Sequence, residues 1–165
     1  MWNAIENLVD WFALIVALFA LALSVLQFIK DSSRQKKEST LNAYSELQHD
    51  VFDKLNNTEY EISEVEFDSV EWKEITGYLA KIERFSVGIN TGIYSIEVLN
   101  RLGGSYFLFR FNELKPIIEI KEKNNEVDGK HYDEFQKTAK RLKEYRECKN
   151  DFERLYKRMT WLIKN

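Results

Sequence analysis

The chain is poor in the residues that build disulfides, metal sites and turns. Its 165 residues include one cysteine, one proline, six glycines and two histidines. The single cysteine, Cys148, excludes an internal disulfide and a thiolate metal cluster. Few prolines and glycines leave few points at which a helix must stop. This composition favours a largely helical chain, and we expect no cofactor.

Recognisable catalytic motifs are also missing. The sequence has no GxSxG, HExxH, CxxC, Walker or protein-kinase signature. His49 lies four residues before Asp53, and His131 precedes Asp133 and Glu134. Two separate histidines without a ligand cluster are typical of solvated or capping side chains. We therefore expect no catalytic residue, no metal-ligating residue and no enzymatic activity.

Positive charge is not in excess over the whole chain. Charged residues make up 31% of it and the formal net charge is -3, so electrostatics give no reason to expect a nucleic-acid partner. Residues 59–71 carry six acids and no base. Such a run is typical of a solvated face, and it could also receive a basic partner.

One long apolar run lies near the amino terminus. Residues 11–29 contain no formal charge, and as a helix they extend over roughly 28 Å, about one hydrocarbon thickness. Their twelve Leu, Ile, Val and Phe residues favour insertion by about 4–7 kcal/mol. A secretory signal has basic residues before its apolar core, whereas Glu6 and Asp10 precede this run without any Lys or Arg. We predict an uncleaved transmembrane helix.

The flanking charges predict the orientation of this helix. Basic residues cluster directly after it and are expected at the lipid headgroups on the cytoplasmic side. Residues 1–10 then form a short extracytoplasmic tail, and the protein crosses the membrane once with its amino terminus outside. The basic cluster comprises Lys30, Arg34, Lys36 and Lys37.

Small residues recur on one face of the predicted span. Ala13, Ala17, Ala20 and Ser24 follow one another at spacings of four, three and four, which permits close approach of a second helix. We therefore predict a homo-oligomer that associates through this stripe. A pore is a further step, because no intramembrane charge marks an ion path and its constriction would be apolar.

Apolar residues after the span recur at helical spacing. Residues 30–57 predict a juxtamembrane helix that continues the span, and residues 58–165 predict a cytoplasmic helical bundle. Asp68 with Glu71 is expected to cap a helix with a regular apolar stripe. That stripe comprises Trp72, Ile75, Leu79, Ile82, Phe85 and Ile89.

Further helices are expected towards the carboxyl terminus. A short helix over 95–102 precedes an aromatic helix from Ser105, which we expect to end in a corner at Pro116. A long last helix is expected over 130–163. Its apolar face comprises Phe135, Ala139, Leu142, Phe152, Leu155, Met159 and Leu162. The predicted fold class is all-α: one N-terminal transmembrane helix followed by a cytoplasmic helical bundle.

Two charged residues interrupt the apolar helix around residues 72–89. A half-buried charge needs a partner, so we expect Glu83 and Arg84 either to form an internal ion pair between helices or to make a ligand site together with Asn90.

The stretch YLAKIERFSVGINTGIYSIEVLNRLGG, followed by an aromatic segment and LKPII, resembles a family of small bacterial proteins with one N-terminal membrane helix and a helical domain of unknown function. The resemblance covers about residues 70–122. It implies a bacterial cytoplasmic (inner) membrane setting and no particular reaction. The layout is also similar to that of the membrane accessory proteins of RNA-targeting CRISPR defence, which resemble oligomeric pores with a HEPN-type bundle.

A HEPN-type RNase is disfavoured by the residues themselves. Such nucleases need an Arg followed four to six residues later by a His, and neither His49 nor His131 has an Arg at that distance before it. The segment most similar to this motif runs from Arg84 to Asn90. Its last residue is Asn instead of the His that would act as a general acid or base.

Two functions follow from these features. The first is a non-enzymatic, membrane-anchored helical interaction module with a cytoplasmic protein partner. The alternative is an oligomeric, membrane-permeabilising effector or accessory protein in bacterial anti-phage defence.

Overall fold

The structure, a computed structural model, describes residues 2–58, 61–124 and 132–148, together with residues 153, 156 and 160. The chain divides into two compact units, Met1–Glu38 and Ser39–Asn165, called here the N-terminal unit and the helical unit. All regular secondary structure in the described ranges is helical. The predicted all-α fold class is therefore confirmed.

The N-terminal unit consists of the first part of α1 (Trp2–Leu47). The side chains of residues 11–29 are all exposed, with Phe19 at 67% and Phe28 at 75%. Among the described helices, α1 alone is long and apolar enough to cross a membrane. The core helix of a soluble protein is mostly buried, and this segment is not. α1 continues past residue 29 and ends at Leu47, where the π-helix η1 (Gln48–Phe52) begins.

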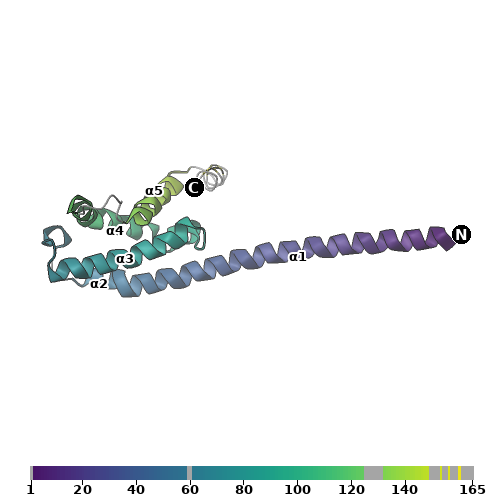
Figure 1. The fold of residues 1–165 in the computed structure, drawn as a ribbon, viewed down its shortest axis with the longest axis horizontal. Helices are drawn as coiled ribbons and strands as arrows, with labels where there is room; N and C mark the ends of the chain where they lie inside the picture. Colours follow the sequence, from purple (N-terminus) through teal and green to yellow (C-terminus); the bar gives the residue numbers. More distant parts are fainter. Residues whose placement is uncertain are drawn as a thin grey trace. The chain divides into compact units, whose positions relative to one another are not determined.

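The helical unit begins with the end of α1, and within the described ranges up to residue 148 it continues with three longer helices and three short ones. α5 packs against both α3 and α4, and α3 also contacts η1 (Figure 1). After α1, the elements are the π-helix η1 (Gln48–Phe52), α2 (Asp53–Asn56), the 3-10 helix η2 (Ile62–Glu64), α3 (Val70–Asn90), α4 (Ile96–Asn124) and α5 (Asp133–Glu147).

The core of the helical unit is aliphatic and aromatic. Phe107 is fully buried and contacts Phe52 and Phe135 edge to face, with ring centroids 6.5 and 5.3 Å apart, a geometry that stabilises beyond burial alone. All six predicted stripe residues of α3 are buried. In α5 the predicted face is buried as far as Leu142. Its other predicted members, Phe152, Leu155, Met159 and Leu162, lie outside the described residues.

α4 is kinked at Gly103, where the backbone is not helical. The kink separates the predicted short helix from the aromatic helix that follows it. The phenol of Tyr44 fills the space beside Gly103, since a Cβ atom added there would lie 1.8 Å from the Tyr44 hydroxyl oxygen. Glycine is therefore required at this position by close approach rather than by an unusual φ angle.

The predicted corner at Pro116 is wrong, because α4 continues through this residue to Asn124. Proline deprives the carbonyl of Asn112 of its helical donor. Both residues are exposed, so water can bond to that carbonyl. The next two side chains, Ile117 and Ile118, are buried and hold the segment on the core.

The predicted cap of α3 is wrong by one residue. The hydroxyl of Ser69 accepts a hydrogen bond from the Trp72 backbone N–H at 3.0 Å, which makes Ser69 the N-cap. Asp68 has a left-handed φ of 65°, which Asp tolerates. Its carboxylate lies 3.3 Å from Lys73 instead.

The predicted long helix over 130–163 is not continuous. α5 ends at Glu147, and Cys148 is extended with φ -66° and ψ 127°. The Cys148 side chain is buried and its thiol donates to the Glu144 carbonyl oxygen at 3.2 Å. The thiol thus replaces the backbone N–H that would bond to the Glu144 carbonyl oxygen if the helix continued.

The contact at Gly103 makes a testable prediction. We expect Gly103→Ala to lower the free energy of unfolding by about 1–3 kcal/mol, because the Tyr44 ring must move from its packed position. Gly77 is a matched control, since it lies inside α3 with no heavy atom within 4 Å of an added Cβ. Gly77→Ala should stabilise the chain by about 0.5–1 kcal/mol. Urea unfolding of the full chain in detergent measures both, and equal effects would contradict the contact.

Candidate functional site

The three predicted site residues on α3 do not converge on one site. Glu83 and Asn90 bond to the beginning of α5. Arg84 instead lines a groove bounded by the end of α1 and by α3. The predicted ligand or ion-pair site is therefore divided between two places.

Glu83 acts as the cap of α5 from a neighbouring helix. Its two carboxylate oxygens accept hydrogen bonds from the backbone N–H groups of Glu134 and Phe135, at 3.0 and 2.7 Å. The N-cap residue of α5 itself, Tyr132, has a left-handed backbone and makes no side-chain cap bond. Free N–H groups at a helix start favour a negative group, so Glu83 fixes the start of α5 on α3.

Asn90 completes this junction. Its amide nitrogen donates to the backbone oxygen of Glu134 at 2.9 Å and to the carboxylate of the same residue at 2.8 Å. Lys137 pairs with Asp133 and Glu134 at 2.7 and 2.9 Å, and these bonds raise the pKa of Lys137. Asn90 thus joins α3 to the start of α5, whereas Lys137 pairs with residues of α5 itself.

Burial raises the pKa of Glu83 above its ordinary value of 4.5. The two backbone N–H bonds act in the opposite direction, and the negative charges of Glu134 and Asp133 add to the rise. Burial therefore disfavours the charged form of Glu83 at neutral pH, and its two backbone hydrogen bonds offset only part of this desolvation penalty.

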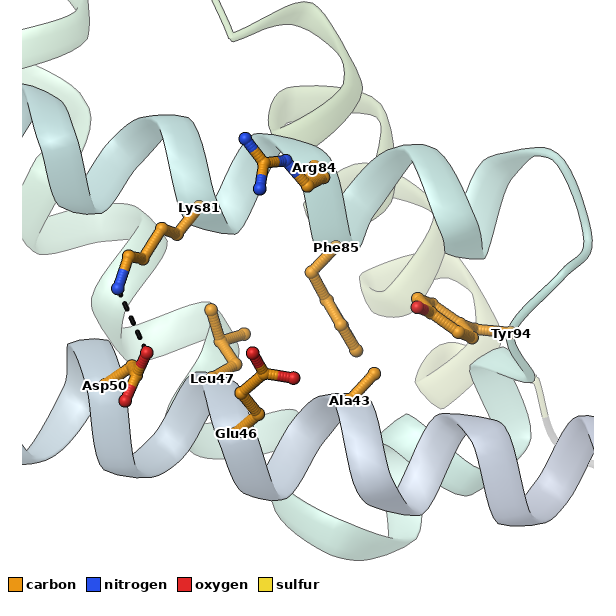
Figure 2. A pocket seen from close by; sticks show the side chains of 8 residues that line it. All are labelled: Ala43, Glu46, Leu47, Asp50, Lys81, Arg84, Phe85 and Tyr94. Atoms are coloured by element: carbon orange, nitrogen blue, oxygen red, sulfur yellow. Dashed lines mark hydrogen bonds and ion pairs between the residues drawn. The ribbon is translucent and has the colours of Figure 1, made fainter.

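The second place is an open groove of about 170 Å³ between the end of α1, η1 and α3 (Figure 2). Lys81 and Asp50 meet at 3.0 Å at one end. Phe85 and Tyr94 stack at 5.4 Å at the other end. The complete lining is Ala43, Glu46, Leu47, Asp50, Lys81, Arg84, Phe85 and Tyr94.

Two acidic and two basic residues line the groove. Asp50 and Lys81 form an ion pair, whereas Glu46 and Arg84 do not form one with each other. The hydrogen bond from Lys81, followed by that from His49, lowers the pKa of Asp50 below its ordinary 3.8. Within the part of the chain that the structure describes, Glu46 and Arg84 have no hydrogen bond or ion pair. Figure 2 shows the Glu46 carboxylate between the two helices and the Arg84 side chain along α3 at the rim.

The groove combines apolar and charged surface. Its apolar floor lies beside the Glu46 carboxylate and the Arg84 guanidinium, neither of which is paired within the described residues. No nucleophile is paired with a base there, and the described residues contain no cluster of three His, Cys, Asp or Glu side chains that could hold a metal. The sequence spacing carries a signal for this site, because Glu46 precedes Asp50 by four residues and Lys81 precedes Arg84 by three, which places each pair on one helical face.

A second polar network, around Arg110, was not predicted from the sequence. Arg110 is 3% exposed, and its guanidinium donates to Asn56, to Glu113 and to the Tyr106 hydroxyl. It also lies 5.1 Å from the centre of the Tyr106 ring. A buried charge must be fully partnered, so this network ties the end of α2 to α4. Its position within the aromatic run YFLFRFNEL is the signal that could have revealed it.

Comparison with known families decides what kind of chain this is. Residues 12–142 match the family model of a domain of unknown function, DUF4760. The chain belongs to the DUF4760 family. The resemblance to an uncharacterised family is confirmed, and the match extends beyond residues 70–122 to cover most of α1 and the whole groove. No curated protein and no solved structure matches the chain.

The raised pKa of Glu83 predicts how stability changes with pH. A carboxyl group whose folded pKa is raised stabilises the fold fully below its ordinary pKa and loses this contribution as pH rises through the raised value. Glu83→Gln removes the titration and keeps one acceptor oxygen. The stability of the wild type relative to Glu83→Gln should therefore fall as pH rises above 4.5, measured by denaturant unfolding at several pH values.

Asp50→Asn serves as a control of opposite sign. The pKa of Asp50 is lowered, so its contribution is present above the ordinary pKa and is lost as pH falls. A wild-type advantage over Glu83→Gln that grows with pH would contradict the assigned direction.

Proposed function

We propose that this DUF4760 chain is a non-enzymatic, membrane-anchored helical interaction module of the bacterial cytoplasmic membrane. The observation that carries the proposal is the run of exposed side chains over residues 11–29 of α1, all of them apolar except Ser24 and Gln27. The segment is long enough to cross the hydrocarbon, and its transfer from water is favourable by about 4–7 kcal/mol.

The residues that follow the apolar segment support an orientation with the helical unit in the cytoplasm. Lys30, Arg34 and Lys37 are exposed, and basic residues next to a span are retained on the cytoplasmic side. Arg34 lies 2.9 Å from Glu38. An exposed pair of this kind contributes little energy, so Arg34 is free to exchange Glu38 for a lipid phosphate. Lys36 completes the headgroup cluster.

Self-association is proposed through Ala13, Ala17, Ala20 and Ser24. Small side chains let two helix backbones approach closely in lipid. The Ser24 hydroxyl donates to the Ala20 carbonyl oxygen at 2.9 Å, so it does not require water or a partner chain to be satisfied. The only hydroxyl group of the stripe is therefore already hydrogen-bonded within the helix, so the stripe can pack against a second helix in hydrocarbon.

Matched leucine substitutions test the interface. Ala17→Leu with Ala20→Leu places two bulky side chains on the stripe and should abolish cross-linked oligomers in membranes, because the backbones can no longer approach. Ala22→Leu is the control, since residue 22 lies two positions from residue 20 and on the opposite helix face. It should leave cross-linking unchanged.

Three outcomes would count against this proposal. A wild-type chain that is strictly monomeric in membranes, or a double variant that cross-links like the wild type, removes the self-association. Loss of membrane potential on induction of the wild type would favour the permeabilising effector over the module.

A further inference from the structure

We propose that the groove between α1 and α3 binds a small zwitterionic ligand with an apolar group, of the class of free α-amino acids. The carboxylate of the ligand pairs with Arg84, its ammonium group pairs with Glu46, and its apolar side chain lies on the floor between them. This inference concerns the helical unit alone and does not depend on the membrane anchor.

The first reason is the contrast between the two pairs of opposite charges that line the groove. Asp50 and Lys81 meet directly at 3.0 Å, whereas Glu46 and Arg84, one helical turn further along each helix, make no bond to each other or to other described residues. A ligand that carries both charges can pair with both groups at once. A purely anionic ligand would leave Glu46 facing its negative charge, and a cationic ligand would do the same to Arg84.

The second reason is the apolar surface between the charges. Leu47 and Phe85 are buried, Ala43 is half-buried, and Tyr94 stacks on Phe85. Phe85 extends from α3 towards Ala43 in Figure 2. This surface is suited to a branched aliphatic or aromatic side chain, whose burial provides binding energy that the exposed charges alone do not supply.

Size favours a small ligand over a peptide. The groove holds about 170 Å³, which is below the roughly 300–1,000 Å³ of pockets for drug-sized ligands. The Asp50–Lys81 pair closes one end, and the Phe85–Tyr94 stack bounds the other (Figure 2). An extended peptide or a partner helix would have to continue past both ends.

The test is equilibrium binding of tritiated L-leucine and L-phenylalanine to the full chain in detergent or nanodiscs, measured by scintillation proximity. Unlabelled N-acetyl-leucine lacks the ammonium group, leucinamide lacks the carboxylate and glycine lacks the apolar side chain. We expect each of the three to compete at least tenfold less well than leucine, because each removes one of the three contacts.

Variants of Glu46 and Arg84 test whether each of these two charges contacts the ligand. Glu46→Gln and Arg84→Gln should each weaken leucine binding at least tenfold, whereas Arg101→Gln, an exposed arginine of α4 outside the groove, should not change it. The exchange of both charges, Glu46→Arg with Arg84→Glu, should restore binding to within a few-fold of wild type, with the ligand reversed.

Three results would overturn the proposal. They are no binding of either amino acid, binding that the single variants leave unchanged, and competition by N-acetyl-leucine or leucinamide that is as strong as competition by leucine. Specific cross-linking of a protein through a photoreactive residue at position 84, blocked by neither amino acid, would assign the groove to a protein partner instead.

Discussion

Exposed apolar side chains along residues 11–29 of α1 are the constraint on which the proposed behaviour of this protein depends. A helix satisfies its own backbone hydrogen bonds, so the environment of this segment is decided by its side chains alone. Their preference for lipid, about 4–7 kcal/mol, is comparable to the net stability of many folded domains. The segment is part of α1, which runs from Trp2 to Leu47.

The helical unit is organised by a few buried polar contacts within an apolar core. Glu83 and Asn90 hold the start of α5, and Arg110 joins α2 to α4. Such contacts contribute less to net stability than apolar burial does, but they are costly to leave unmade, so they restrict the helices to one arrangement. Glu46 and Arg84 are exposed instead and make no such contact within the described residues, and the proposed ligand would pair with both.

Sequence periodicity predicted the elements whose formation depends on local spacing. The apolar stripe of α3 and the break near Gly103 follow from a 3.6-residue repeat and from glycine. The corner at Pro116 and the single helix over 130–163 were wrong, because buried isoleucines after the proline and the buried side chain of Cys148 override local preference. The partners of Glu83 are more than fifty residues away in the chain, and no pattern in the sequence specifies such a contact. The groove has the same limit, because the sequence shows the charged residues of α1, η1 and α3 but does not show that they line one groove.

Alkaline carbonate extraction of membranes, followed by the intact mass of the chain in each fraction, tests the proposed anchor most directly. The account predicts that the chain stays with the membrane pellet and has the mass of all 165 residues. Release of the full chain into the carbonate supernatant, or a shortened chain that has lost the apolar segment, would contradict it.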